Sequence, residues 1–289
     1  MAKGTRKQVS ALAPWFGSNR TLAHHVGEAL KGLEWVGVLF AGGMAEVPHI
    51  DARTIMVNDQ HKHLLNLARV ASHPRLGSRL VRILRRLPVH PNVLSYAQHR
   101  CERIESGEEF PTEDDMVEWA EHYFVCCWMS RSGAAGTSRE FKASFVERWD
   151  AGGGDSALRF RSATEALRDW RRATARATFT CKDAFEMIAR TKDKRRHGLY
   201  GDSPFPGAGR RYRHNAGKTD AEERKWHTRL RDGVQRFEQT RVVMRFYDHP
   251  LIRELYDPSR WDWKFLDGGK TQANETAPEV LLINRTEAK

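Results

Sequence analysis

The residues best suited to do chemistry lie in the segment 197–214. A short apolar run at 198–200 is followed by Asp202, Ser203, Pro204 and Phe205. This pattern predicts a strand that presents a carboxylate, a stiff turn and an aromatic ring at its carboxyl end, where open α/β sheets bind ligands. A basic segment follows at 210–214. Together these groups suit a flat nitrogenous base attached to a phosphate chain.

Two predicted strands nearer the amino terminus end in residues that could hold a cofactor. The apolar run 35–40 precedes Gly42 and Gly43, and glycine lets the backbone approach a ligand closely. The run 54–57 precedes Asp59, which lies sixteen positions after Gly43. Nucleotide-binding sheets hold ribose hydroxyls with an acid about 20 residues further on. The alternatives left open are a tight glycine loop and an acid that only caps the next helix.

The overall charge favours a polyanionic partner. The 289 residues carry a formal net charge of +11, and each contact with a phosphate releases counterions. Four cysteines without a C-x-x-C pair argue against a zinc site and for buried thiols in a reducing cytoplasm. Neither a signal-like segment nor an apolar run of about 18 residues is visible, so we expect a cytoplasmic protein without a membrane partner.

The pattern of apolar residues predicts an α/β fold interrupted by helices. Strands are expected at 35–40, 54–57, 178–181, 198–200, 242–246, 261–265 and 280–284. Helices are expected at 21–30, 60–71, 76–86, 93–105, 113–128, 162–175, 184–189, 218–238 and 250–256. Because strand signals fade in the middle of the chain, we predict a catalytic domain of residues 1–75 and 177–289, split by a helical insertion at 76–176.

In their order along the chain, these pieces resemble the D12 class of DNA adenine methyltransferases, in particular compact members common in phages and mobile elements. The matching segments are Pro14-Trp15-Phe16-Gly17-Ser18-Asn19-Arg20, Phe40-Ala41-Gly42-Gly43, Val57-Asn58-Asp59, Cys126-Cys127-Trp128, Asp183-Ala184-Phe185, Asp202-Ser203-Pro204-Phe205 and 279–284. Their order and spacing carry the resemblance, which covers most of the chain. It implies a Rossmann-like, S-adenosylmethionine-dependent methyltransferase sheet, with the helical insertion as the target-recognition region.

The resemblance assigns several residues to the cofactor, S-adenosylmethionine. Those implied to bind it are Trp15, Gly17, Arg20, Phe40, Gly42, Gly43, Asp59, Asp183 and Phe185. Trp15 and the turn at Gly17 would flank the methionine end of the cofactor. Asp59 would hold the ribose hydroxyls, and Asp183 and Phe185 would lie around the adenine. No metal is implied.

The same resemblance makes Asp202, Ser203, Pro204 and Phe205 the catalytic residues. An exocyclic aromatic amine is a poor nucleophile because its lone pair is delocalised into the ring. Asp202 and the carbonyl of Ser203 could accept hydrogen bonds from the amine and free that lone pair, while Phe205 stacks on the base. The target, N6 of adenine, must be flipped out of double-stranded DNA. The arginines expected to hold the DNA are Arg131, Arg139, Arg210, Arg211 and Arg213.

Two positions depart from the family pattern and keep other functions open. Ser203 stands where the family has proline, and Asn19 stands where it has lysine. Serine keeps the backbone carbonyl but lacks the ring that fixes φ. The alternatives are a catalytically weakened DNA-binding protein with the same fold, a cytosine-N4 DNA methyltransferase and an RNA methyltransferase. A monomer would suffice for methylation, and a dimer is left open.

Overall fold

A mixed β-sheet forms the centre of the protein. The structure is a computed structural model that describes residues 11–15, 22–131, 141–147, 156–266 and 278–286. Within these residues the strands form a seven-stranded sheet in the order β3-β2-β1-β4-β5-β7-β6. They are β1 (Trp35–Val38), β2 (Thr54–Asn58), β3 (Ala177–Thr180), β4 (His197–Gly201), β5 (Arg241–Tyr247), β6 (Trp261–Leu266) and β7 (Glu279–Asn284). Each strand matches an apolar run identified in the sequence.

The sheet is parallel from β3 to β5 and antiparallel beyond β5. β1 pairs in parallel with β2 and β4, β2 with β3, and β4 with β5. β7 runs antiparallel to both β5 and β6. The chain thus builds outward from β1 in one direction and then from β4 in the other, as in doubly wound proteins. The predicted α/β class is confirmed, and the sheet is compatible with a Rossmann-like fold.

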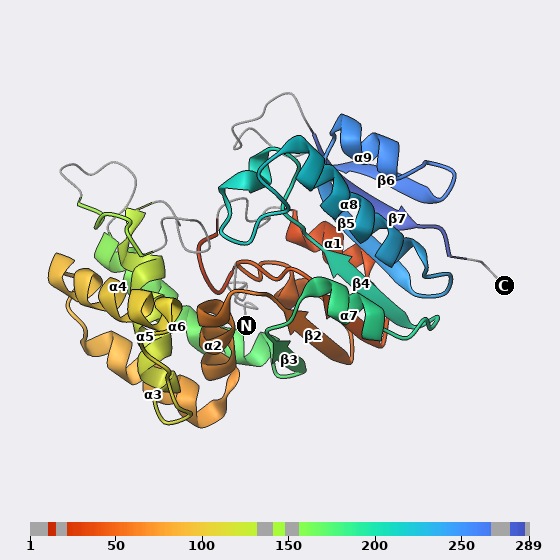
Figure 1. Cartoon of the computed structure of the whole chain (residues 1–289). Coiled ribbons are helices and arrows are strands. Elements are labelled where there is room, and N and C mark those ends of the chain that lie inside the picture. The colour runs from red at the N-terminus through yellow and green to blue at the C-terminus, as the bar shows by residue number, and fades with distance from the viewer. Residues whose placement is uncertain (1–10, 16–21, 132–140, 148–155, 267–277, 287–289) are drawn as a thin grey trace.

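Helices cover both faces of the sheet (Figure 1). One face packs against α1 (Ala23–Ala29) and α2 (Lys62–Ser72), and the other packs against α7 (Ala184–Arg190), α8 (Asp220–Gln235) and α9 (Pro250–Leu255). Each face has its own cluster of buried apolar side chains. Along β5 the side chains alternate, so Val243 joins the first cluster and Met244 the second. Because both faces are buried at the centre of the sheet, β1, β4 and β7 are largely apolar, whereas the edge strands β3 and β6 carry exposed or polar residues.

The remaining helices gather at one end of the molecule (Figure 1). They are α3 (Pro74–Arg86), α4 (Pro91–Ser106), α5 (Met116–Met129) and α6 (Ser156–Ala173). α6 begins earlier than predicted, at Ser156 instead of Ser162, and its early turns bury Phe160 against Phe124 of α5. α5 begins later than predicted, at Met116, and the acidic residues 113–115 precede it.

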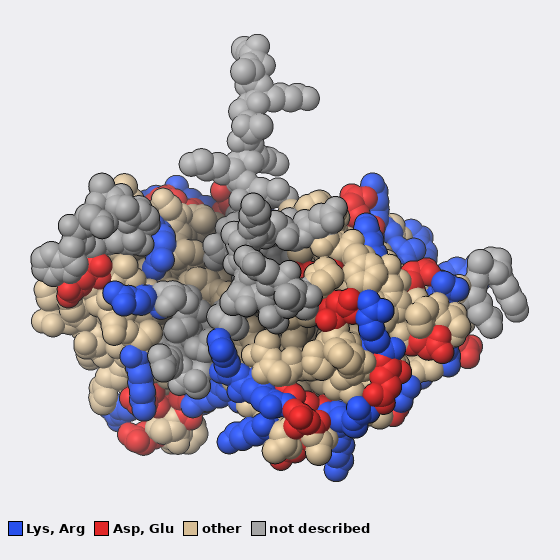
Figure 2. Space-filling model, turned by 90° about the horizontal axis from the view of Figure 1, so that it is seen from above, with Lys and Arg blue, Asp and Glu red and all other residues tan. Residues whose placement is uncertain are grey.

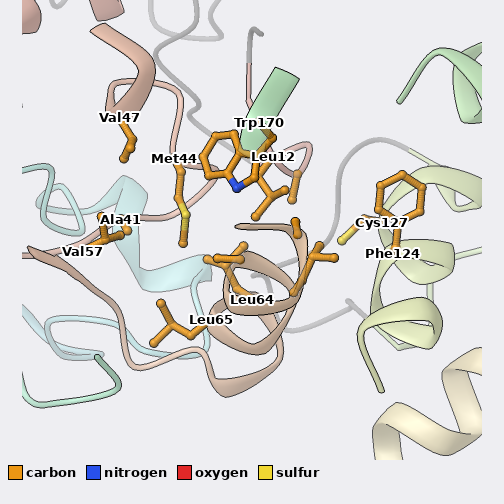
Figure 3. Close-up of a cluster of buried hydrophobic side chains, with 14 of the residues drawn as sticks. Leu12, Ala41, Met44, Val47, Val57, Leu64, Leu65, Phe124, Cys127 and Trp170 are labelled. Atoms are coloured by element: carbon orange, nitrogen blue, oxygen red, sulfur yellow. The ribbon is translucent and has the colours of Figure 1, made fainter. Parts of the chain in front are cut away.

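These helices share their core with the sheet. Figure 3 shows side chains from α2, α5 and α6 near those of the loop after β1. Leu64, Phe124 and Trp170 belong to the same cluster of buried residues as Val57 of β2. α2 therefore packs against the sheet on one side and against the helical end of the molecule on the other.

Asn58 ties the carboxyl ends of β1, β2 and β3 together. Its fully buried side chain donates from Nδ2 to the carbonyl oxygens of Leu39 (3.1 Å) and Lys182 (3.0 Å). Its Oδ1 accepts from the amide of Lys182 (3.0 Å) and from the hydroxyl of Thr180 (2.9 Å). One buried amide group thus fixes the backbone from which the candidate site is built.

We expect Asn58→Ala to lower the free energy of unfolding by about 2–4 kcal/mol, because several buried polar groups lose their partner. Thr178→Val is the matched control. It removes one long hydrogen bond, 3.5 Å to the carbonyl of Ile55, between β3 and β2. It should cost less than about 1 kcal/mol. Urea unfolding followed by circular dichroism gives both values, and equal losses would contradict the role assigned to Asn58.

Candidate functional site

The candidate site lies at the carboxyl ends of β1 and β4. These strands are neighbours at the centre of the sheet, and the chain leaves them toward opposite edges. Such a point of reversal is where open α/β sheets bind ligands. The amide of Leu39 donates to the carbonyl of Tyr200 at 2.8 Å, so the two strand ends remain paired up to the loops that follow them. The loops at 39–45 and 202–209 both start at this point.

Trp15, Gly42 and Asp59 form one cluster at this edge. Gly42 has a φ of +45°, and its amide donates to Oδ2 of Asp59 at 2.9 Å. The indole of Trp15 lies against it, because a Cβ on Gly42 would be 3.0 Å from Trp15 Nε1. Oδ1 of Asp59 accepts from the amide of His61 at 2.9 Å. Each carboxylate oxygen keeps a lone pair for a further donor, such as a ribose hydroxyl.

The loop after β1 is held in a tight conformation. The amide of Leu12 donates to the carbonyl of Gly43 at 3.0 Å, and that of Met44 donates to the carbonyl of Ala41 at 2.8 Å. Met44 has a φ of 59° although it is not glycine, and its side chain is fully buried. Such a backbone costs about 1–3 kcal/mol and persists only where the surrounding packing fixes it. The loop is therefore preorganised.

Phe40 and Phe185 come together around Trp226 of α8. The ring centroids of Phe40 and Phe185 lie 5.8 and 5.5 Å from that of Trp226. Cζ of Arg229 lies 3.8 Å from the centroid of the Phe185 ring and covers it. Oδ1 of Asp183 accepts from the amide of Phe185 at 2.7 Å, so Asp183 caps α7. Sequence reasoning identified both phenylalanines but not Trp226.

The carboxylate of Asp202 is bound by a buried arginine. Asp202 follows β4, and Arg245 lies beside it on β5 with 1% of its side chain exposed. Nη1 of Arg245 donates to both oxygens of Asp202, at 2.9 and 2.8 Å. Nε of Arg245 donates to Oε2 of Glu279 on β7, at 3.0 Å. A single guanidinium thus holds carboxylates at the ends of the two strands that flank β5.

Glu46 adds a third carboxyl group to this buried cluster. It follows the loop after β1, and its Oε1 accepts from the hydroxyl of Tyr200 at 3.3 Å. Burial, reinforced by the nearby charge of Asp202, raises the pKa of Glu46 to about 7. Burial likewise raises the pKa of Asp202 to about 6, against the opposing influence of Arg245. Burial therefore favours the protonated form of both carboxyl groups.

Ser203, Pro204 and Phe205 continue the chain from β4. Ser203 is buried, and its hydroxyl has no hydrogen-bond partner within the described part of the chain. Pro204 packs against Gly209, on which a Cβ would lie only 2.8 Å from the Cβ of Pro204. The ring of Phe205 stands edge-on to that of Tyr247, with centroids 4.5 Å apart, and is 8% exposed. The proposed stacking ring is thus firmly held.

The arginines expected to contact DNA differ in what they do within the protein. Arg210 forms ion pairs with Asp220 and Glu223 of α8. Arg211 and Arg131 are exposed to solvent. On the face seen in Figure 2, basic side chains are interspersed with acidic ones, so the positive charge forms no single continuous patch among the residues coloured there.

Arg213 belongs to a network around Glu105 that joins the loop after β4 to the helical end. Its Nη1 lies 3.3 Å from Oε1 of Glu105. Trp119 donates to Nδ1 of His63 at 2.7 Å, which leaves the proton on Nε2 of His63 to face Glu105 at 3.0 Å. Although burial acts to raise it, the hydrogen bond from His63 and the charges of Arg213 and Lys62 lower the pKa of Glu105 to about 2.

Two arginines of α6, Arg161 and Arg172, make contacts within the protein. Arg161 donates to the carbonyl oxygens of Leu84 (3.0 Å) and Leu87 (2.7 Å) at the end of α3. Arg172 lies 2.9 Å from Asp169 of the same helix. These arginines stabilise the packing and the surface of the helical end, which accounts for part of the positive charge seen in the sequence.

Three of the predicted site residues, Gly17, Arg20 and Arg139, lie outside the described residues, as does Asn19. In the portion of the chain that the structure describes, no group of three or more His, Cys, Asp or Glu side chains could hold a metal ion. None of the helices in that portion is long and apolar enough to cross a membrane.

Sequence reasoning missed Arg245 and Glu46 as parts of the site. Arg245 had a signal, because it is the single charged residue in the apolar run 242–246. A charge in a strand buried on both faces requires a partner of opposite charge. Glu46 had no such signal, since a glutamate shortly after a strand is ordinary and its burial depends on the fold.

No family model matches this chain. A search of curated proteins also finds no match. The evidence for function therefore comes from the residues of the site and from the fold that brings them together.

Gly42→Ala should displace the indole of Trp15, because the added methyl group would occupy its space and the backbone has a positive φ. Gly32→Ala is the matched control, since Gly32 has a φ of +81° but no atom lies within 4 Å of the place its Cβ would take. Gly32→Ala should lose about 1 kcal/mol of stability because of its positive φ, and Gly42→Ala should lose more, because its methyl group also meets the indole. Only Gly42→Ala should change the tryptophan fluorescence and near-UV circular dichroism, and unchanged spectra would contradict this packing.

Glu46→Gln should make the stability less dependent on pH. The pKa of Glu46 rises from 4.5 to about 7 on folding, so its contribution is full below pH 4.5 and is lost as the pH rises through about 7. Denaturant unfolding at several pH values between about 5 and 8 should show a smaller decline for this variant than for the wild type. Glu28→Gln, at an exposed position of α1, should keep the wild-type decline; identical slopes for all three proteins would rule out this role for Glu46.

Proposed function

We propose that this protein is an S-adenosylmethionine-dependent DNA methyltransferase that acts on the N6 amine of adenine. The observation that carries this proposal is the meeting of two groups at the central strand ends. Asp202 and Phe205 follow β4, while Trp15, Gly42 and Asp59 cluster beside β1 and β2. The first group suits a flat base with an exocyclic amine, and the second suits a cofactor with a ribose.

The residues after β1 and β2 fit the cofactor. Gly42 has no side chain, so a ligand can approach its backbone beside the indole of Trp15. Asp59 retains lone pairs for the ribose hydroxyls. Phe40 and Trp226 offer aromatic surface against which a purine can pack. When bound, S-adenosylmethionine would supply an electrophilic methyl group on its sulfonium.

Asp202 and Phe205 would prepare the target base for attack. Asp202, when ionised, accepts hydrogen bonds from the exocyclic amine and draws its lone pair out of conjugation with the ring. Phe205 limits the positions that the base can take. In the proposed transfer, a nitrogen–carbon bond would form as the carbon–sulfur bond of the cofactor breaks, and the bonding electron pair would remain on sulfur. The nitrogen then loses a proton to solvent, which restores a neutral amine.

The charge of the protein fits a nucleic-acid partner. The formal net charge of +11 favours binding to a polyanion through released counterions. Arg211 lies close in sequence to the base-holding residues and is exposed, so it can reach a phosphate. Extrusion of the base from the duplex costs a few kcal/mol, which such backbone contacts offset.

A second candidate is a DNA-binding protein that keeps this fold but turns over slowly or not at all. It is favoured by one observation: both oxygens of Asp202 already accept from Arg245. The amine would then have to use the remaining lone pairs of a carboxylate that is held in place. Ser203, in the position where the resembled family has proline, points the same way.

Incubation with methyl-labelled cofactor and duplex DNA of mixed sequence should label the DNA. Mass spectrometry of its nucleosides should then show N6-methyladenine. Asp202→Asn should lower the rate by about a hundredfold or more, because the charged acceptor is lost. Asp262→Asn is the matched control, since Asp262 pairs with Arg285 on the surface and lies outside the site. It should keep the wild-type rate.

The other outcomes separate the alternatives. N4-methylcytosine in the product would make cytosine the acceptor. Labelling of structured RNA in preference to DNA would change the substrate class. No transfer to any nucleic acid, by a folded protein that binds the cofactor and DNA, would support the second candidate and reject the first.

A further inference from the structure

Arg245 contacts both groups that are proposed to hold the target base. Its Nη1 donates to both carboxylate oxygens of Asp202. Its Cζ lies 5.2 Å from the centroid of the Phe205 ring. The carboxylate of Asp202 and the ring of Phe205 therefore contact the same guanidinium.

Arg245 is itself held in place from the other side. Oε2 of Glu279 accepts from Nε at 3.0 Å and lies 2.8 Å from Nη2. Glu279 pairs in register with Tyr247, two residues along β5 from Arg245, so the hydrogen bonds of the sheet fix its backbone. With both edges of its planar group bound and 1% of its side chain exposed, Arg245 cannot turn away from Asp202.

We propose that Arg245 is a positioning residue of the base pocket: braced by Glu279, it orients the carboxylate of Asp202 and keeps it ionised, ready to accept the amine. This inference rests on the proposed methyl transfer. A carboxylate offers about four lone-pair positions, and the two contacts from Arg245 leave others for the amine. The acceptor is then oriented before the base arrives, and such preorganisation is what lowers a barrier.

The charge of Arg245 matters as much as its shape. The titratable or charged groups around Asp202 are Arg245, Glu279, Glu46, Tyr200, Tyr212 and Tyr247. Burial and the acidic neighbours favour the protonated carboxyl, which raises the pKa of Asp202, while Arg245 opposes that rise. Without Arg245, Asp202 would stay protonated to higher pH and would present a hydroxyl donor where the amine needs an acceptor.

Arg245→Lys is the sharpest variant, because lysine keeps the charge but cannot bind two carboxylates through one planar fork. We expect its kcat for methyl transfer to fall about a hundredfold. Because the variant loses the hydrogen bonds from Arg245 that favour the ionised carboxylate of Asp202, the acidic limb of its pH–rate profile should move to higher pH. Its KM for the cofactor should stay at the wild-type value. Arg253→Lys is the matched control: Arg253 also makes a two-point ion pair, with Asp248, but at the surface of α9. It should keep the wild-type kcat and profile.

A merely structural role predicts a different result for Arg245→Lys. Activity would then fall only in proportion to the folded fraction, with the acidic limb in its wild-type place, and this outcome would overturn the inference. If Arg245→Lys does not fold, Glu279→Gln takes its place. That variant leaves the contacts with Asp202 but weakens the contact that holds the other edge of the guanidinium, so kcat should fall by a smaller factor. Because the charge of Glu279 raises the pKa of Asp202, the acidic limb should move to lower pH in this variant.

A measurement without turnover separates this inference from the proposed function. A carbon-13 NMR titration of the aspartate carboxyl groups follows Asp202, which is assigned by its loss in Asp202→Asn. Its titration midpoint should rise in Arg245→Lys and stay unchanged in Arg253→Lys. A risen midpoint in a protein whose wild type transfers no methyl group would reject the proposed function and keep the ionising role of Arg245. An unchanged midpoint would reject the inference, whether or not the protein is an enzyme.

Discussion

A positive charge inside a protein has to be met by negative charge, and Arg245 imposes this condition on the centre of the sheet. An unpaired guanidinium there would cost several kcal/mol, so each strand beside β5 must bring a carboxylate to it. Asp202 and Glu279 do so from opposite sides. A slip of one residue between β5 and β7 would turn the carboxylate of Glu279 to the other face. The need to pair the buried guanidinium of Arg245 therefore constrains both the register of β5 with β7 and the geometry of the site.

Much of the fold could be predicted from the sequence because most strands and helices produce local patterns of apolar residues. The central strands are short runs rich in apolar residues, because burial on both faces disfavours polar side chains there. Helix ends were less predictable, since the start of α6 depends on the burial of Phe160 against a distant helix. The order of the strands has no local pattern at all, because β1 meets β4 only after the whole helical stretch between them.

The residues of the candidate site also fall into those that the sequence could identify and those that it could not. Asp59 and Asp202 could be found because each directly follows a strand, and strand ends converge in this class of fold. Arg245 could be recognised as a charge within a buried strand, but its partners could not be identified. Glu46 and Trp226 could not be found, since their roles depend on partners that are remote in sequence. Charge alone made Arg210 and Arg213 candidates for phosphate binding, yet both have acidic partners in the fold. Whether an arginine is available to a ligand is a property of the folded surface.

The pairing of β1 with β4 also determines when the centre of the sheet can form during synthesis of the protein. Trp35 pairs with His197, so the central parallel ladder cannot begin until the residues between them have been made. At about 5–20 residues per second, translation of that stretch takes roughly 8–30 s. Contacts among neighbouring helices are more local and form sooner. While β1 waits for its central neighbour, the newly made α2 can cover Val36 and Val38, which lie in the same cluster of buried side chains, and so protect that face from aggregation.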